Sequence, residues 1–93
     1  MKLVASKLFE KKYKRIALKN QLLKMNIDKT LRLLEIDIFD SSLETHKLTG
    51  NLAGFWATSC GKDCRIIFKI EVSLITNENV IILLNFGKHD EVY

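Results

Sequence analysis

The sequence contains no proline, only four glycines and only two cysteines in 93 residues. Two cysteines cannot build the multiple-disulfide framework of a small secreted protein, which indicates a protein kept in a reducing compartment. No segment approaches the roughly 18 consecutive apolar residues of a membrane helix, and the basic start lacks the apolar stretch and cleavage site of a secretory signal. We therefore expect a soluble, cytoplasmic protein that does not associate with membranes.

Motifs for metals and nucleotide cofactors are also missing. The sequence has no phosphate-binding P-loop, no glycine-rich dinucleotide fingerprint and no nucleophile elbow. A zinc site at Cys60 and Cys64 would need two further ligands, and the only histidines, His46 and His89, do not have metal-ligand spacing. We expect no metal and no cofactor. The two cysteines flank a three-residue turn, so they are either reduced structural thiols or, if oxidised, a disulfide; the first state is favoured in a reducing compartment.

Charge is distributed unevenly along the chain. Residues 1–32 carry ten lysines and arginines against two acidic residues, a net charge of +8, whereas residues 33–93 carry a net charge of −4. A concentrated basic surface favours polyanions such as RNA, or an acidic protein partner. The charge alone is equally consistent with a solvated helical face. With 47% hydrophobic and 28% charged residues, the chain is not a disordered tail, and its length fits one domain over residues 1–93.

The hydrophobic periodicity predicts an α+β domain with the order β-α-α-β-β-β. The expected strands and helices cover residues 2–6 (strand), 7–18 and 21–36 (helices), and 55–60, 64–72 and 80–86 (strands). Because very few residues connect the two helices, they should form an antiparallel hairpin, packed on one face of an antiparallel sheet. Ser6 is the expected cap of the first helix.

The two helices have apolar and basic faces. In the first helix one side carries Phe9, Tyr13 and Ile16. The roughly opposite side carries Lys7, Lys11, Lys14 and Arg15. The second helix has a stripe at the spacing of a buried face, made of Leu23, Ile27, Thr30, Leu31 and Leu34.

The last two strands allow an estimate of register. A hairpin centred on residues 76–77 pairs Phe68 with Leu84 and Arg65 with Gly87, and brings Asp63 near His89. Alternation along the strand points Arg65 to the face of the sheet that the helices leave open. A histidine beside a carboxylate and an arginine can transfer protons and stabilise a phosphate. Gly87 would let a substrate backbone approach closely.

Each of these residues also has a structural explanation. His89 alone is consistent with an exposed histidine near the chain end, and His46 with a surface residue. Arg65 on a strand is commonly the partner of a cross-strand ion pair. Single residues therefore do not decide the function.

Three segments together resemble the RelE/ParE toxin superfamily, and most closely its YafQ-like branch. These are the segments 46–57 (HKLTGNLAGFWA), 63–68 (DCRIIF) and 83–93 (LLNFGKHDEVY), preceded by the basic helical hairpin. The resemblance implies a toxin of a type II toxin–antitoxin module. The ribonuclease members of the family cleave mRNA in the ribosomal A site without a metal, through attack of the 2′-hydroxyl on the adjacent phosphate.

The same resemblance implies roles for particular residues. His89 would be the leading proton-transfer group, Asp63 would orient it and His46 would be the second acid or base. Arg65 would stabilise the phosphate, and Tyr93 would orient or stack on a base. Auxiliary phosphate contacts would come from Lys47, Lys62 and Lys88, while the basic first helix with Lys7, Lys11, Lys14 and Arg15 would contact ribosomal RNA.

The sequence also departs from the branch. The hairpin reads Thr58-Ser59-Cys60-Gly61 where members often carry another histidine, Lys88 replaces a small hydroxyl residue, and the usual prolines are absent. The expected partners are an acidic antitoxin, the ribosome with mRNA, and operator DNA reached only through the antitoxin. Two other functions remain open: a ParE-like, non-catalytic inhibitor of DNA gyrase, and a catalytically inactive module that binds its antitoxin.

Overall fold

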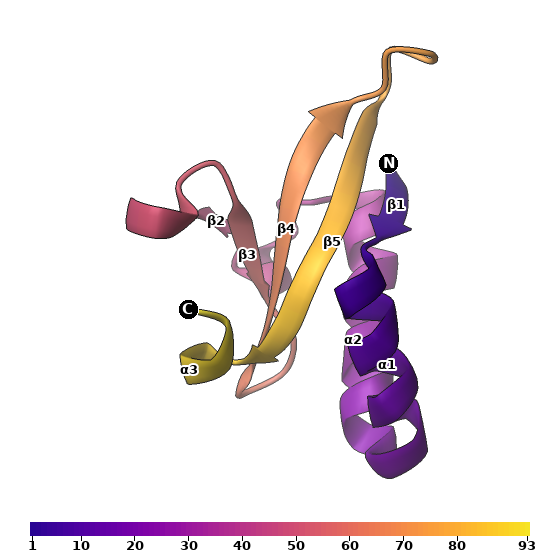
Figure 1. Ribbon diagram of the computed structural model, residues 1–93, viewed down its shortest axis with the longest axis vertical. Helices are drawn as coiled ribbons and strands as arrows, with labels where there is room; N and C mark the ends of the chain where they lie inside the picture. The colour runs from indigo at the N-terminus through magenta and orange to yellow at the C-terminus, as the bar shows by residue number, and fades with distance from the viewer.

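A computed structural model describes all 93 residues and shows a helical layer against a twisted sheet (Figure 1). The elements in chain order are β1 (Lys2–Ala5), α1 (Lys7–Lys19), α2 (Gln21–Ile36), η1 (Ser41–Leu43), β2 (His46–Lys47), η2 (Gly50–Leu52), β3 (Trp56–Ser59), β4 (Cys64–Val72), β5 (Asn79–Lys88) and α3 (His89–Val92). The strand order is β1-β5-β4-β3-β2. The predicted α+β class, with a helical hairpin on one face of the sheet, is confirmed.

Three details of the architecture differ from the prediction. β1 runs parallel to β5, because the whole intervening chain connects them and no tight turn fixes their relative direction. β2 is only two residues long and pairs with β3, too short a segment to produce a period in the sequence. β5 continues past the expected end at residue 86 to Lys88, and the chain then forms the single turn of α3. No helix has the length and apolar character needed to cross a membrane.

Polar caps fix the two ends of the helical hairpin. The Ser6 hydroxyl accepts a hydrogen bond from the backbone N–H of Phe9 at 3.1 Å, which confirms the predicted cap. Asn20 alone separates the helices: its backbone N–H donates to the Ile16 carbonyl, and its side chain accepts from the N–H of Leu23. One residue therefore ends α1 and begins α2, which forces the helices to pack side by side.

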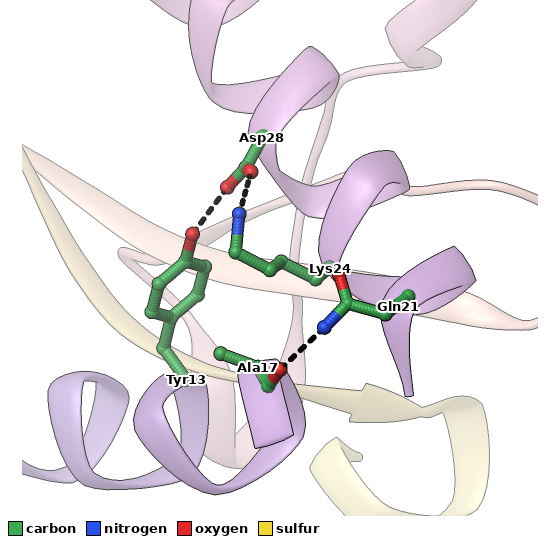
Figure 2. Close-up of polar contacts among 5 residues, drawn as sticks. All are labelled: Tyr13, Ala17, Gln21, Lys24 and Asp28. Atoms are coloured by element: carbon green, nitrogen blue, oxygen red, sulfur yellow. Dashed lines mark hydrogen bonds and ion pairs between the residues drawn. The ribbon is translucent and has the colours of Figure 1, made fainter. Parts of the chain in front are cut away.

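A polar triad joins the two helices (Figure 2). The Tyr13 hydroxyl donates to Oδ1 of Asp28 at 2.5 Å, and the Lys24 ammonium contacts Oδ2 at 2.8 Å. Burial favours a higher pKa for the Asp28 carboxyl, but the hydrogen bonds from Lys24 and Tyr13 outweigh it and hold the pKa below its ordinary value. The folded state thus favours the ionised carboxylate.

A bulge in β5 decides which side chains face the helices. Arg65 pairs with Gly87 as predicted, but Phe68 pairs with Leu83 and not with Leu84. Between the turn and the interruption every pair is offset by one residue from the predicted register, and the extra residue of β5, Leu84, restores that register from Ile67 onward. The expected core faces of α1, α2 and β4 are confirmed. The central core consists of Phe9, Ile27, Leu34, Ile38, Leu43, Cys60, Cys64, Ile66, Phe68, Ile81, Leu83 and Phe86. In β5, odd-numbered residues face the core before the bulge and Phe86 does so after it.

Lys12 of α1 forms hydrogen bonds to β5 beyond the end of β1. β1 pairs with β5 only as far as Leu83. Beyond that point the Lys12 ammonium donates to the carbonyl of Phe86 and, at 2.7 Å, to Oδ1 of Asn85. It also lies 5.1 Å from the centre of the Phe86 ring. A charged side chain thereby satisfies acceptors on the open border of β5.

Gly61, in the turn between β3 and β4, provides a stability test. Its φ is +80°, and a Cβ there would lie 2.8 Å from Nδ2 of Asn26 on α2. Gly61→Ala should cost about 1–2 kcal/mol of unfolding free energy for the left-handed backbone, plus the displacement of Asn26. Gly50→Ala is the matched control, because its φ is +66° with nothing near a new Cβ. Denaturant unfolding should show the larger loss for Gly61→Ala, and an Asn26→Ala background should remove the difference. Equal losses in the parent background would contradict the predicted contact.

Asp28 should make the protein sensitive to acid. Because its pKa is lowered in the folded state, the stabilisation is complete above the ordinary value of 3.8 and disappears as the pH falls through the lower folded value. The melting temperature of Asp28→Asn should therefore fall less than that of the parent between about pH 6 and about pH 2. Glu35→Gln, on the exposed end of α2, should retain the parental acid sensitivity. An unchanged slope for Asp28→Asn would show that the triad does not contribute.

Candidate functional site

A groove opens on the side of the sheet away from α1 and α2. Figure 1 shows β2, the turn that follows it and α3 gathered on that side. The groove has a volume of about 460 Å³ and is called the histidine groove below. Its lining residues are His46, Lys47, Leu48, Thr49, Asn51, Leu52, His89 and Tyr93. Segments about forty residues apart in the sequence thus contribute both histidines of the protein to one hollow.

His46 enters the groove from the edge strand β2. Its Nδ1 lies 2.9 Å from the backbone carbonyl of Glu44, a residue held at φ 51°. Because a carbonyl can only accept a hydrogen bond, Nδ1 carries the proton in this contact. A neutral His46 ring therefore keeps Nε2 free as a proton acceptor, which is the form that a general base requires.

His89 and Tyr93 form the other wall. His89 begins α3 and Tyr93 directly follows its end, and their rings meet edge to face with centres 4.3 Å apart. The carboxylate against the His89 ring is that of Asp90, with Oδ1 3.6 Å from Nδ1, so a protonated ring has a negative neighbour. This pair is exposed, and its energetic contribution is therefore small. Burial raises the pKa of the Tyr93 phenol, and the positive charge of Arg65 opposes that rise.

Arg65 lies on β4, on the same face of the sheet as the histidine groove but not among its lining residues. The neighbouring residues Cys64 and Ile66 point into the core, so alternation along the strand places Arg65 on the open face as predicted. Its Nη1 donates to the carbonyl of Cys64 at 2.9 Å. Its positive charge opposes the rise in the Tyr93 pKa that burial causes.

Lys47 is held over an aromatic ring next to His46. Its ammonium lies 5.3 Å from the centre of the Trp56 ring, and Trp56 in turn packs edge to face on Phe39. Trp56 therefore positions a cation beside the histidine groove. The resemblance implied a phosphate contact for Lys47, whereas the position of Trp56 beneath its ammonium comes from the structure.

A second hollow lies on the helical side, and Asp63 belongs to it. This hollow, called the cationic cavity below, measures about 570 Å³. Its charged lining residues are Lys12, Arg15, Lys62, Asp63, Lys88 and Glu91, and both cysteines also line it. Asp63 thus lines the cationic cavity, whereas His89 lines the histidine groove. Lys12 is a cation that the sequence analysis did not single out, although its place three residues after Phe9 and four before Ile16 puts it on the apolar side of α1.

The other predicted phosphate contacts are divided between the two sides. Lys62, Lys88 and Arg15 line the cationic cavity. Lys7, Lys11 and Lys14 are exposed on α1 and line neither hollow. No three or more His, Cys, Asp or Glu side chains come together in an arrangement that could hold a metal ion.

Gly87 serves the protein's own packing. A Cβ there would lie 3.4 Å from Cβ of Glu91 and from Cγ1 of Val92, both in α3. The Glu91 carboxylate also accepts from the backbone N–H of Lys88 at 3.3 Å, which caps the turn. Gly87 thus lets α3 fold back over the end of β5, and the space that the sequence analysis reserved for a substrate is occupied by α3.

The family follows from a comparison over the full length of the chain. The sequence profile described as "Bacterial toxin of type II toxin-antitoxin system, YafQ" matches residues 1–93. The chain belongs to the YafQ toxin family. The resemblance seen in the three sequence segments is thereby confirmed. No curated protein sequence matches this YafQ-family chain.

Solved structures share the fold of this YafQ-family chain at low identity. A YoeB/ParE toxin from Agrobacterium tumefaciens is 18% identical with a TM-score of 0.79, over 96% of this chain and 99% of that one. YafQ from E. coli strain BL21(DE3) is 15% identical with a TM-score of 0.73, over 98% and 96% of the two chains. A chain of the E. coli DinJ–YafQ complex is 19% identical with a TM-score of 0.70, over 98% and 96%. These matches establish the RelE/YoeB-like fold.

The link between Arg65 and Tyr93 can be measured by titration. In a Tyr13→Phe background Tyr93 is the only tyrosine, so ultraviolet absorbance reports its ionisation alone. Arg65→Gln should move the Tyr93 midpoint to higher pH, because the charge that opposes the effect of burial is lost. Lys69→Gln is the matched control, because Lys69 lies on the same strand but is paired with Glu71. If both variants titrate like the parent, Arg65 does not act on this wall of the groove.

Proposed function

We propose that this YafQ-family toxin is an endoribonuclease that cleaves mRNA on the ribosome, using side chains of the histidine groove and no metal ion. The observation that carries the proposal is the presence of both histidines, from β2 and α3, in one groove on the open face. A gyrase inhibitor or an inactive binding module has no need of two proton-transfer groups facing one hollow. The proposed site is His46, His89, Arg65 and Tyr93, with Lys47 at its edge.

The proposed reaction is an attack by the 2′-hydroxyl of one nucleotide on its own 3′-phosphate. The 2′-oxygen–phosphorus bond forms while the bond from phosphorus to the 5′-oxygen of the next nucleotide breaks. A base removes the hydroxyl proton and an acid protonates the leaving oxygen, leaving a 2′,3′-cyclic phosphate and a free 5′-hydroxyl. Two histidines, one neutral and one protonated, supply both functions.

The groove geometry favours a particular assignment of the two roles. His46 is the base, because its Nδ1–H is engaged by the Glu44 carbonyl and Nε2 is left as an acceptor. His89 is the acid, because the Asp90 carboxylate and the edge of the Tyr93 ring adjoin it. Arg65 stabilises the extra negative charge on phosphorus in the transition state, a role suited to its planar guanidinium.

The remaining predicted residues receive secondary roles. Tyr93 keeps its proton at neutral pH, since burial raises its pKa, so the phenol can donate a hydrogen bond to the RNA or support a base. Lys47, fixed on Trp56, contacts a neighbouring phosphate. Asp63 acts indirectly, through the turn that precedes Arg65. The lysines of α1 contribute nonspecific attraction to ribosomal RNA, which salt should screen.

The proposed partner that restrains the toxin is an acidic antitoxin. Chains with the same fold have been crystallised as the DinJ–YafQ complex from E. coli and the YoeB–YefM complex from Staphylococcus aureus. In this chain the basic hairpin, with a net charge of +8 over residues 1–32, provides the complementary surface. Operator DNA would be reached only through the antitoxin.

Cleavage by purified toxin on programmed ribosomes tests the proposal. With EDTA present, mapped mRNA ends should show cuts in phase with codons, bearing cyclic phosphate and 5′-hydroxyl termini. His89→Gln and His46→Gln should each lower the cleavage rate at least about 100-fold, the usual contribution of an acid or base. Both side chains are exposed, so melting temperatures should stay at the parental value.

Matched variants separate the alternatives. Lys69→Gln, on the open face outside the groove, should cleave at the parental rate, and Asp63→Asn should lose much less activity than His89→Gln. If Asp63→Asn lowered the cleavage rate as much as His89→Gln does, Asp63 would act directly in the catalytic site. Intact mRNA with impaired supercoiling would identify a gyrase inhibitor. Intact mRNA and no effect on growth would identify an antitoxin-binding module.

A further inference from the structure

Cys60 and Cys64 lie directly opposite each other at the turn end of the β3–β4 ladder. Ser59 pairs with Arg65, so the next opposed pair is Cys60 and Cys64, and the Cys60 N–H donates to the Cys64 carbonyl at 2.9 Å. Directly opposed residues of an antiparallel ladder have Cα atoms roughly 4.5–5.5 Å apart, which falls within the range of a disulfide. Both side chains belong to the same core cluster, so they leave the sheet on the same face. The backbone therefore already holds the two cysteines at bonding separation.

The two thiols are free, and a cavity leads to them. Both are buried, at 1% and 6% exposure, and both line the cationic cavity. Its volume of about 570 Å³ admits a small oxidant. The cavity lies on the helical side, so its chemistry is separate from that of the histidine groove.

The surroundings make the two thiols unequal. The hydrogen bond with the Cys64 thiol lowers the pKa of Cys60 against the opposing effect of burial, with further support from Thr30 and the charge of Arg65. The same thiol pair raises the pKa of Cys64, and burial adds to the rise. Cys60 is thus the sulfur that is more readily deprotonated, and the thiolate is the form that reacts with oxidants.

We propose that Cys60 and Cys64 are a peroxide-sensitive pair that forms a reversible disulfide within one chain, across the base of the β3–β4 turn. This modification goes beyond the proposed ribonuclease activity and does not depend on it. The bond would fix the turn that carries Lys62 and Asp63 and would anchor the strand residue that precedes Arg65. Oxidation would thereby act on the cationic cavity and on the start of β4 together.

The chemistry requires one equivalent of a small peroxide. The Cys60 thiolate attacks one oxygen of hydrogen peroxide, the O–O bond breaks, and Cys60 becomes a sulfenic acid with release of hydroxide. The Cys64 sulfur then attacks the Cys60 sulfur, loses its proton and displaces hydroxide. In total, two thiols and one peroxide give one disulfide and two waters, and a small thiol reductant reverses the modification.

The position of Lys62 makes the bond easy to detect. Trypsin cleaves after Lys47, Lys62 and Arg65, which separates the two cysteines into the peptides 48–62 and 63–65. After treatment of the full chain with hydrogen peroxide, and alkylation under denaturing conditions, these peptides should remain joined. The intact mass should fall by about 2 Da with loss of both alkylatable thiols, and dithiothreitol should restore them.

Two variants test the order of events. In Cys64→Ser the sulfenic acid on Cys60 has no partner, so a cyclic dione should trap it. In Cys60→Ser the remaining Cys64 thiol should react with peroxide at least about tenfold more slowly than Cys60 does in the other variant. Neither readout uses RNA, so this test of the disulfide is independent of whether the protein cleaves mRNA.

Three results would overturn the proposal. The first is that both thiols persist under conditions that fully oxidise glutathione in the same solution. The second is that the thiols disappear independently, without the joined peptides. The third is that the linked peptides come only from covalent dimers, which nonreducing electrophoresis would reveal.

Discussion

The pairing of β4 with β5 is the constraint on which the rest of the molecule depends. Nine residues of β4 are matched along β5, with a single interruption opposite Ile67 and Phe68. Without the extra residue at the interruption, strict alternation would turn Phe86 away from the core and reverse the end of β5. The bulge therefore lets Ile81, Leu83 and Phe86 share one core while the chain emerges at His89 on the open side.

The two hollows follow from this arrangement. Residues that leave the sheet toward the helices meet the apolar side of α1, and at the end of β5 they border a hollow whose charged lining is mostly cationic. Residues on the other face meet β2 and α3, and they form a hollow with two imidazoles. One small sheet thus separates the two cysteines from the two histidines.

Much of the fold could be predicted from the sequence, because strong periodicity and capping residues act locally. The stripe that includes Ile27 and Leu34 marked a buried helix face, and Ser6 marked a helix start. The partner of Phe68 was wrong because the turn between β4 and β5 sets a register one residue away from the predicted one. The pairing of Arg65 with Gly87 was correct because the bulge at Leu84, which no residue type in the apolar run 80–84 indicates, cancels that offset.

The candidate site was harder to predict, because it depends on elements too short to show a period. β2 has two residues and α3 four, yet these supply both histidines. Asp63 and His89 are near each other in the ladder, but a turn residue and the first residue of a helix need not point to the same side. Family resemblance identified the residues, whereas their division between two hollows required the three-dimensional arrangement.

The position of Lys12 has a consequence for how the protein behaves in solution. Beyond Leu83 the outer border of β5 would otherwise offer backbone acceptors to any extended peptide, including another molecule of the same toxin. The Lys12 ammonium occupies that border. A neutral strand that paired there would displace the ammonium from its acceptors and leave the charge desolvated and unpaired. A single lysine thereby disfavours the addition of a further strand along this border of the sheet.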